Sequence, residues 1–202
     1  MSEDKKSAKH KAAMEKQKAK VDANIAKADE ERGVLVLLTG NGKGKSSSAF
    51  GMAIRSLGYG HKVAIIQFIK GQQLSGEEMF IRDHHPEVYF HQMGTGFTWN
   101  TQDRSSDIAA AEATWQHAQT CLNNPEYDLV ILDELTYMLA YKYLDEEQVL
   151  DALRQRPREQ SVVVTGRGGG SAIRELADTV SEIQDIKHAF RAGVKARAGV
   201  DL

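Results

Sequence analysis

The stretch Thr39-Gly40-Asn41-Gly42-Lys43-Gly44-Lys45-Ser46 decides the fold class of this 202-residue chain. It follows the apolar run Val34–Thr39, which is typical of a strand buried on both faces, and it precedes a helical pattern that begins at about Lys45. A glycine-rich loop between a buried strand and a helix can direct several backbone N–H groups at an anion. The stretch therefore predicts an α/β protein with a phosphate-binding P-loop.

Two side chains of this loop have the chemistry that a bound triphosphate needs. Lys45 supplies a cation to the phosphates, and Ser46 supplies a hydroxyl to Mg²⁺. The spacing departs from the standard motif, because Thr39 stands where a glycine is expected and Gly40 comes one residue late. We expect a phosphate cradle of altered shape with the same chemistry. Glycines that merely turn a strand into a helix would not account for two lysines and a hydroxyl.

A second apolar run, Asp128–Leu132, ends in the carboxylates Asp133 and Glu134. In a parallel sheet, the carboxyl end of this strand lies at the same edge as the P-loop. Mg²⁺ keeps several waters, so one carboxylate and one hydroxyl are enough protein ligands. The spacing leaves open which of the two carboxylates contacts the metal, and ordinary surface acids at a strand end are the plainer alternative.

Strand and helix patterns alternate through the rest of the globular part. Strands are expected at 62–69, 87–92, 161–165 and 179–184, and helices at 75–78 and beyond, 106–122, 145–155 and 171–177. Such alternation favours right-handed crossovers and one doubly wound, mostly parallel sheet of the P-loop NTPase or RecA-like type. Residues 33–202 are therefore predicted to form a single α/β domain, with a loop or tail from residue 187.

Residues 1–32 differ from this domain in composition. They are rich in Ala, Lys, Glu and Gln, and they contain neither Gly nor Pro. This composition favours a helix, but the apolar stripe is thin and consists of Met14, Val21 and Ile25 with alanines. The segment is predicted to be a polar helical extension. Two interpretations stay open: a disordered extension, or a segment that becomes ordered over a ligand or partner.

The overall composition narrows the function classes. A net charge of −2 gives no argument for binding nucleic acid or an anionic membrane, and no apolar run approaches the roughly 20 residues of a membrane span. Cys121 is the only cysteine, which precludes an intrachain disulfide and fits a reducing compartment. We expect a cytoplasmic protein without nucleic-acid or membrane partners.

Two further loops could contact a second ligand. Met93–Trp99 is rich in glycine and contains Phe97 and Trp99, which suits a lid over a large flat ligand, although a local aromatic cluster is an alternative. Gly166–Gly170 could face an anion, but a plain turn would explain this glycine pattern equally well. His188 near the C-terminus could also face the site, although a lone histidine is more often structural.

Six segments together resemble the P-loop branch of the ATP:cob(I)alamin (corrinoid) adenosyltransferase family. They are Gly40–Ser46, Gln67-Phe-Ile-Lys-Gly71, Met93-Gly-Thr-Gly-Phe-Thr-Trp99 with Thr101-Gln102, Leu132-Asp-Glu-Leu-Thr-Tyr137, Val164-Thr-Gly-Arg-Gly168, and His188-Ala-Phe with Ala192-Gly-Val-Lys-Ala196. Many ATPases share the phosphate loop, whereas its combination with Gly-Phe-Thr-Trp and Asp-Glu-Leu-Thr-Tyr is specific. The resemblance covers nearly the whole chain.

The resemblance implies transfer of the 5′-deoxyadenosyl group of ATP to the cobalt of a reduced corrinoid, with release of triphosphate. The corrinoid would be cobalamin or a biosynthetic precursor. Mg²⁺, a reduced flavoprotein as electron donor and a homodimer are implied as well. In the family, ATP lies in reverse orientation on the altered P-loop, and the N-terminal helix can fold over the corrinoid. The alternatives are an ordinary P-loop ATPase and a non-catalytic, ATP-gated corrinoid-binding protein.

The resemblance also implies roles for individual residues. Phe97 and Trp99 match corrinoid-binding aromatics that help to displace the lower ligand of cobalt, and together with Lys45 they are the expected catalytic residues. Mg²⁺ is expected at Ser46 and Glu134, with Asp133 as the weaker candidate. The expected ATP contacts are Gly40, Asn41, Gly42, Lys43, Gly44, Lys45, Ser46, Ser47 and Arg55. The sequence departs from the family pattern at Ser46, where Thr is usual, and at Asn100, Asp103, Ser105-Ser106 and Gly169-Gly170-Ser171.

Overall fold

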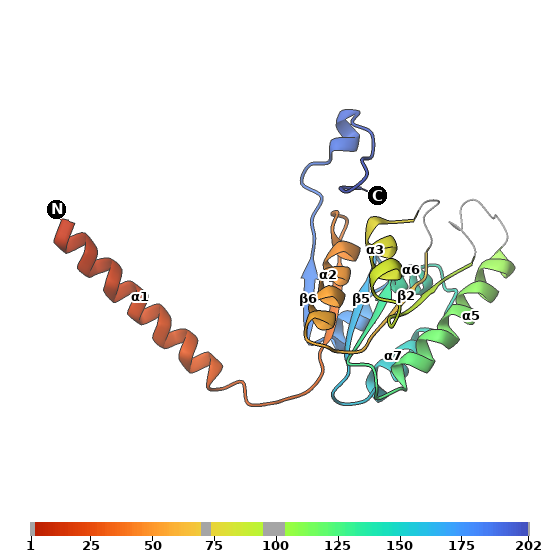
Figure 1. The fold of residues 1–202 in the computed structure, drawn as a ribbon, viewed down its shortest axis with the longest axis horizontal. Coiled ribbons are helices and arrows are strands. Elements are labelled where there is room, and N and C mark those ends of the chain that lie inside the picture. The colour runs from red at the N-terminus through yellow and green to blue at the C-terminus, as the bar shows by residue number, and fades with distance from the viewer. Residues whose placement is uncertain (1–2, 70–73, 95–103, 202) are drawn as a thin grey trace. The chain divides into compact units, whose positions relative to one another are not determined.

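A computed structural model of the chain describes residues 3–69, 74–94 and 104–201 (Figure 1). The chain divides into two units, Met1–Glu31 and Arg32–Leu202. The first unit contains one helix, α1 (Glu3–Ile25), which agrees with the high helix propensity of its sequence. The second unit contains the sheet and everything that follows it.

The described residues of the second unit form one parallel sheet of six strands, in the order β3-β2-β4-β5-β1-β6. The strands are β1 (Leu35–Thr39), β2 (Val63–Gln67), β3 (Tyr89–Gln92), β4 (Leu129–Asp133), β5 (Ser161–Thr165) and β6 (Thr179–Glu182). The helices are α2 (Lys45–Gly58), α3 (Gly76–His84), α5 (Arg104–Leu122), α6 (Leu135–Ala140), α7 (Glu146–Gln155), α8 (Ser171–Leu176) and the short 3₁₀ helix η1 (Ala189–Ala192). The predicted α/β fold with a parallel sheet is confirmed.

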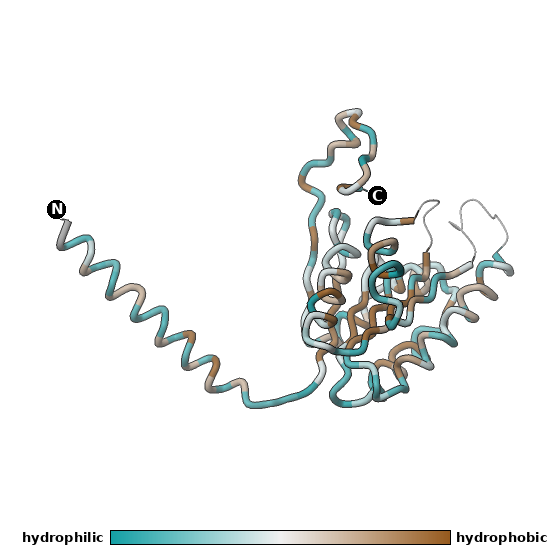
Figure 2. Tube along the Cα trace, viewed as in Figure 1, coloured by the Kyte–Doolittle hydropathy of each residue, from teal (hydrophilic) through white to brown (hydrophobic). Residues whose placement is uncertain are grey.

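Both faces of the sheet are covered, which explains why the central strands are continuous apolar runs. Along β1, Leu35 and Leu37 belong to one core cluster, with α5, α6, α7 and α8, whereas Val36 and Leu38 belong to a second cluster, with α2 and α3. Every residue of β1, β2 and β4 is buried. Figure 2 shows these strands as the most hydrophobic part of the second unit. Successive side chains point to opposite faces, and each face has its own helical layer.

Three local features differ from the sequence-based expectations. Helix α6 was not predicted, because the six residues that follow Asp133 and Glu134 are too short a run to show a helical period. Ser75 caps α3 by accepting from the backbone N–H of Glu78 at 3.2 Å, as expected, but the Glu78 carboxylate pairs with Arg82 instead of closing the capping box. The segment from residue 187 is more than a tail, because it turns and returns to the P-loop.

Candidate active site

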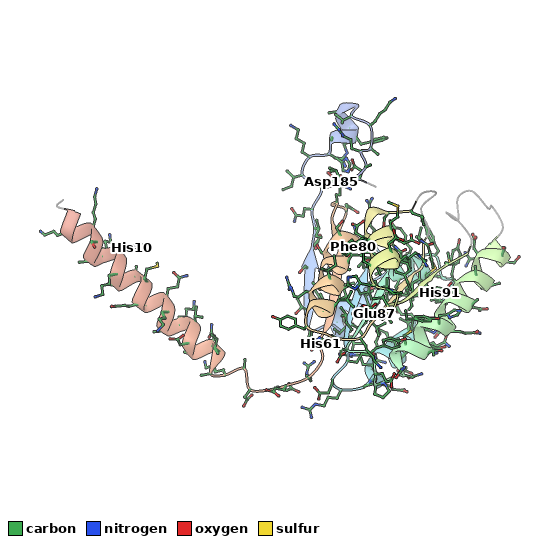
Figure 3. The ribbon with its side chains drawn as sticks, in the orientation of Figure 1. His10, His61, Phe80, Glu87, His91 and Asp185 are labelled. Carbon is green, nitrogen blue, oxygen red and sulfur yellow. The ribbon has the colours of Figure 1, made fainter. Side chains whose placement is uncertain are left out.

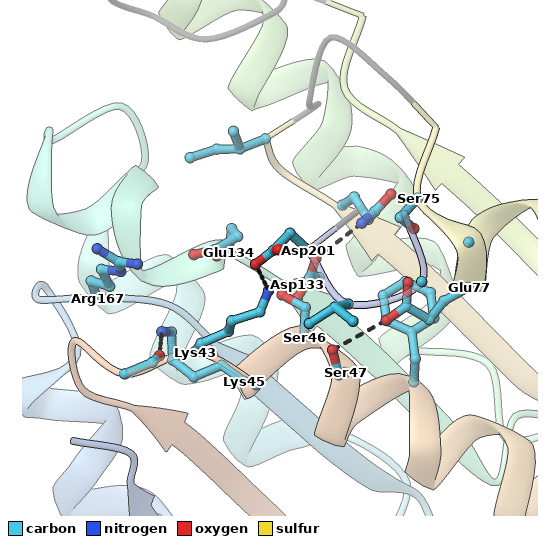
Figure 4. Close-up of a pocket in the computed structure, with 18 of the residues that line it drawn as sticks. Lys43, Lys45, Ser46, Ser47, Ser75, Glu77, Asp133, Glu134, Arg167 and Asp201 are labelled. Atoms are coloured by element: carbon cyan, nitrogen blue, oxygen red, sulfur yellow. Dashed lines mark hydrogen bonds and ion pairs between the residues drawn. The ribbon is translucent and has the colours of Figure 1, made fainter. Parts of the chain in front are cut away.

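A cavity of about 960 Å³ opens at the carboxyl edge of the sheet (Figure 4). Its size lies near the upper end of the roughly 300–1,000 Å³ typical of small-molecule sites. Four segments that follow strands β1, β2, β4 and β5 meet there, because parallel strands bring their carboxyl ends to one edge. The wall is formed by Gly42, Lys43, Gly44, Lys45, Ser46, Ser47, Phe50, Ile54, Gln67, Ile69, Ser75, Gly76, Glu77, Phe80, Asp133, Glu134, Tyr137, Arg167, His188, Gly199, Val200 and Asp201.

The P-loop ends in a helix N-terminus that no side chain caps. Helix α2 begins at Lys45, and its N-cap residue Gly44 has φ 109°, a left-handed conformation that favours glycine. No side-chain hydrogen bond caps this helix. The first N–H groups of a helix lack partners within it and carry partial positive charge. This end of α2 therefore suits a bound anion.

Two glycines of the loop are required by packing against the chain that leaves β6. A Cβ added to Gly40 would lie 2.4 Å from the Ile183 carbonyl oxygen, and one added to Gly42 would lie 2.6 Å from that of Gln184. The Gly42 N–H donates to the Ile183 carbonyl at 2.7 Å. The unusual glycine spacing thus reflects contact with residues 183–184, which the sequence interpretation in terms of phosphate binding alone missed.

Both lysines of the loop contact protein oxygens. Lys45 is 5% exposed, and its ammonium donates to the Gly42 carbonyl at 2.7 Å. Burial, together with nearby Arg167, lowers the pKa of Lys45 below its ordinary value. The Lys43 ammonium lies 3.1 Å from an oxygen of Asp201. Lys45 can exchange the Gly42 carbonyl for a phosphate oxygen, which is a stronger acceptor, and Lys43 can exchange one anionic partner for another.

A row of hydrogen bonds runs across four adjacent strands beneath the cavity. Thr165 on β5 donates to one oxygen of Asp133 at 2.7 Å, and Gln67 on β2 donates to the other at 3.0 Å. Gln92 on β3 in turn donates to the Gln67 side-chain oxygen at 3.0 Å and to Glu78 of α3 at 3.1 Å. Both oxygens of the buried Asp133 are therefore occupied, and this carboxylate fixes the ends of the strands.

Glu134 is the carboxylate that remains available. Its backbone N–H donates to the Thr165 hydroxyl at 2.9 Å, and its backbone is left-handed with φ 59°. Its oxygen Oε2 is buried and has no hydrogen-bond partner among the described residues. Burial, assisted by the charge of Asp133, raises the pKa of Glu134 to about 7, while Lys45 and Arg167 oppose the shift. Ser46 lines the same cavity, and a carboxylate oxygen that is buried without a partner among the described residues fits an oxygen-preferring cation such as Mg²⁺.

Arg167 completes the positive lining, and the sequence analysis did not name it as a site residue. It lies in the glycine-rich loop after β5, where Gly166 packs against Thr136 so closely that a Cβ would lie 2.1 Å from the threonine hydroxyl. Figure 4 shows the Arg167 guanidinium at the side of the cavity where Glu134 and Lys45 lie. The sequence held a usable signal in the loop Gly166–Gly170, for which an anion-facing role and a plain turn are both open interpretations, and Arg167 of this loop lines the cavity.

The remaining predicted residues fall into three groups. Ser46 and Ser47 line the cavity, and the Ser47 hydroxyl donates to Glu77 at 3.1 Å. Gly40 and Asn41 belong to the loop but not to the cavity wall, and Arg55 is exposed in the last turn of α2, about 15 Å along the helix from Lys45. The predicted corrinoid-binding residues Phe97 and Trp99 lie outside the described residues.

His188 also lines the cavity, which agrees with one of the two interpretations of that residue. Within the described parts of the chain, no three His, Cys, Asp or Glu side chains gather in an arrangement that could hold a metal ion on their own. None of the described helices is both long enough and apolar enough to span a bilayer.

Comparisons with known proteins point to one family. The family described as ATP:corrinoid adenosyltransferase BtuR/CobO/CobP matches residues 31–202. The chain is 54% identical to the corrinoid adenosyltransferase of Escherichia coli K12, over 91% of this chain and 93% of that protein. It is 53% identical to the corrinoid adenosyltransferase of Pseudomonas aeruginosa (98% and 97% covered) and 52% identical to the corrinoid adenosyltransferase CobA of Salmonella typhimurium (93% and 94%).

Similarity to a solved structure supports the fold but says nothing about function. The flagellar accessory protein FlaH of Methanocaldococcus jannaschii superposes with a TM-score of 0.50 at 13% sequence identity, over 75% of this chain and 71% of that one.

Proposed function

This chain belongs to the ATP:corrinoid adenosyltransferase family, and we propose that the cavity beside its P-loop binds the ATP whose adenosyl group is transferred to a corrinoid. One observation carries this proposal. Three cationic side chains (Lys43, Lys45 and Arg167) line one cavity together with the N-terminus of α2, which no described side chain caps, and a carboxylate oxygen of Glu134 that has no partner among the described residues. This set of groups is complementary to a triphosphate with its cation.

The reaction needs no nucleophile from the protein. Reduced cobalt in the corrinoid substrate attacks the 5′ carbon of ATP with its electron pair and forms a cobalt–carbon bond. The bond between that carbon and the triphosphate oxygen breaks, and its electron pair leaves with inorganic triphosphate. The protein therefore acts by holding two substrates in line, which can contribute about 7–11 kcal/mol through effective molarity.

The leaving triphosphate is the group that the described residues are suited to stabilise. Negative charge rises on the triphosphate oxygen that was bonded to the 5′ carbon as this carbon–oxygen bond breaks. Prearranged cations and N–H donors lower the energy of that state. Lys45 would exchange its bond to the Gly42 carbonyl for a phosphate oxygen. Arg167 approaches from the loop after β5, so charge reaches the triphosphate from more than one element.

Glu134 and Ser46 would hold Mg²⁺ in this site. The buried oxygen of Glu134 supports this choice over Asp133, whose two oxygens accept hydrogen bonds from Thr165 and Gln67. A bound Mg²⁺ would supply positive charge to the phosphates.

The remaining parts of the proposal rest on the family resemblance. Phe97 and Trp99 would contact the corrinoid and favour loss of its lower ligand, and the helix of residues 1–32 would cover the corrinoid. A reduced flavoprotein would supply the electron that generates Co(I), and the working enzyme would be a cytoplasmic homodimer. Cobalamin and a precursor corrinoid are both candidate acceptors.

An anaerobic reaction tests the proposal. The protein is mixed with Mg-ATP and chemically reduced cobalamin, and the products are followed by absorbance and by phosphate analysis, with Lys45→Ala as the comparison. Light-sensitive adenosylcobalamin together with triphosphate is expected from the parent protein, at a rate reduced at least tenfold in the variant. ADP without a change in the corrinoid would indicate an ATPase. Binding without either product would indicate a carrier.

A further inference from the structure

The segment that follows β6, residues 183–201, starts in contact with the P-loop. We refer to it as the C-terminal segment. The Ile183 N–H donates to the Thr39 carbonyl at 2.8 Å, and the Gly42 N–H donates to the Ile183 carbonyl at 2.7 Å. These bonds fix the point from which the segment departs. Figure 3 labels Asp185 at this point, beyond the carboxyl edge of the sheet.

The segment then reverses direction through contacts of its own. Arg191 donates to the Asp185 carboxylate, and the Phe190 N–H donates to the His188 ring nitrogen at 3.2 Å. The Val194 N–H closes the turn on the Ala189 carbonyl at 3.1 Å. The chain is thereby directed back to the cavity, where Gly199, Val200 and Asp201 form part of the wall.

Asp201 meets the P-loop at Lys43. One carboxylate oxygen lies 3.1 Å from the Lys43 ammonium, and the other accepts from the Arg197 N–H at 3.0 Å. The Arg197 hydrogen bond and then the Lys43 contact hold the pKa of Asp201 below its ordinary value, so the carboxylate is charged at neutral pH. The side chains of Lys43 and Asp201 are 45% and 26% exposed. An ion pair this open to water is weak enough to exchange partners.

A triphosphate on the P-loop would compete with Asp201 for Lys43. Lys43 lies two residues before Lys45, in the loop to which the proposed function assigns the phosphates. Asp201 has the same charge sign as the phosphates and lines the same cavity, so it repels them while it holds the cation that they need.

On this basis, which rests on the proposed function, we propose that Asp201 is an internal competitor of the triphosphate for Lys43. It binds Lys43 before the phosphates arrive, yields it to ATP, and recovers it as the product triphosphate leaves. The carboxylate thereby weakens the affinity of the enzyme for its own leaving group and speeds product release. A carboxylate that merely aimed Lys43 at the phosphates would have the opposite effect on affinity.

Equilibrium binding of inorganic triphosphate, measured by calorimetry without corrinoid, tests the competition. Asp201→Asn should bind triphosphate about three- to tenfold more tightly than the parent, whereas Asp201→Glu should bind it as the parent does. This gain in triphosphate affinity should shrink at high salt, because Lys43 and Asp201 are partly exposed and salt screens their charges. Asp151→Asn, which removes an exposed carboxylate on α7, controls for net charge. Unchanged or weaker binding by Asp201→Asn would overturn the inference.

A second pair of variants separates competition for Lys43 from simple repulsion. In a Lys43→Ala background, Asp201→Asn should improve triphosphate binding by less than it does in the parent background. An equal gain in both backgrounds would overturn the competition. If the parent protein itself failed to bind triphosphate, the phosphate site of the proposed function would fall as well, so the two failures are distinguishable.

Discussion

Gln67 donates a 3.0 Å hydrogen bond to Asp133 across the paired ends of β2 and β4. The same amide group accepts from Gln92, so Gln67 is the central member of a row of polar contacts at the sheet edge. Asp133 is 2% exposed, and a buried carboxyl group that lacks hydrogen-bond donors destabilises the fold, so each of its donors matters for stability. Asp133 and Glu134 both line the cavity, but hydrogen bonds tie Asp133 to the strand ends, whereas Oε2 of Glu134 has no partner among the described residues.

Replacement of this glutamine should cost both stability and activity. Gln67→Leu leaves one oxygen of the buried Asp133 without its donor, which is expected to lower the free energy of unfolding by about 1–3 kcal/mol. Urea unfolding measures the loss, and Gln116→Leu on the exposed face of α5 is the matched control, with an expected change within about 0.5 kcal/mol. Equal stability of the two variants would mean that water replaces the missing donor.

The sequence predicted the sheet well because its central strands are buried on both faces. Runs such as Val34–Thr39 and Asp128–Leu132 have no polar alternation, which only a doubly covered sheet explains. Helix α6 escaped prediction for a different reason: its six residues, which follow the carboxylates Asp133 and Glu134, are too few to show a helical period. Periodicity cannot separate a short buried helix from the strand that precedes it.

The site was predictable where one segment contains both the loop and its chemistry, as in Gly40–Ser46. It was not predictable where tertiary contacts assign the roles. Nothing in the order of Asp133 and Glu134 states that Thr165 and Gln67 occupy the first carboxylate and leave the second free. The contact of Lys43 with Asp201 joins residues 158 positions apart (201 minus 43), which no local pattern records.

The matched glycines Gly42 and Gly51 test the packing of the P-loop. Gly42→Ala places a Cβ 2.6 Å from the backbone of Gln184, so it should destabilise the protein by about 2 kcal/mol or more and weaken ATP binding. Gly51 lies in α2 with no atom within 4 Å of an added Cβ. Gly51→Ala should therefore stabilise the helix by about 0.5–1 kcal/mol. Thermal unfolding measures both, and a similar shift for the two variants would contradict the close contact of the P-loop with residues 183–184.

Acid should remove the contribution that Asp178 makes to the free energy of unfolding. Hydrogen bonds from Arg32, and then from the Leu35 N–H, hold the pKa of Asp178 at about 2 in the folded protein, against 3.8 as its ordinary value. The unfolded chain therefore takes up a proton first as the pH falls, and stability is lost between about pH 4 and pH 2. Since the side chain is partly exposed, we expect a contribution of about 1 kcal/mol.

Urea unfolding of the parent and of Asp178→Asn at pH 7, 5, 4 and 3 checks this contribution. The difference between the two proteins should be constant from pH 7 to pH 5 and should narrow toward pH 3. Asp151→Asn, which removes an exposed carboxylate, should show a smaller difference throughout. A difference that stayed constant down to pH 3 would contradict the lowered pKa.

The aromatic residues Phe97 and Trp99 should act on the reduction step. Phe97→Ala or Trp99→Ala is expected to lower turnover from Co(II) corrinoid with a reductant at least tenfold more than turnover from chemically generated Co(I). The reason is that loss of the lower ligand makes cobalt easier to reduce but matters less once Co(I) exists. Parallel anaerobic assays with the two substrates measure the ratio, and equal losses would rule out the proposed role.

Glu134 should control the metal dependence of ATP binding, and pH should expose its role. Burial raises the pKa of this carboxyl to about 7, so its protonated form gains population as the pH falls below 7. Mg²⁺ must displace that proton, and the apparent Mg²⁺ affinity should fall by up to about tenfold per pH unit on the acid side. Glu134→Gln should lower the apparent Mg²⁺ affinity at least tenfold at pH 8, and the affinity of this variant should no longer depend on pH.

Mg²⁺ titrations of ATP binding at pH 6, 7 and 8 compare the parent with Glu134→Gln. Glu147→Gln is the control, because Glu147 is exposed on α7 and its carboxylate faces Arg154 instead of the cavity. The buried oxygen of Glu134 accepts no hydrogen bond from a described residue, so replacement by the neutral amide should leave the fold intact. If Glu134→Gln kept the parent's Mg²⁺ affinity and pH profile, the cation would have to be held without Glu134, and Asp133 would return as the candidate despite its two hydrogen bonds.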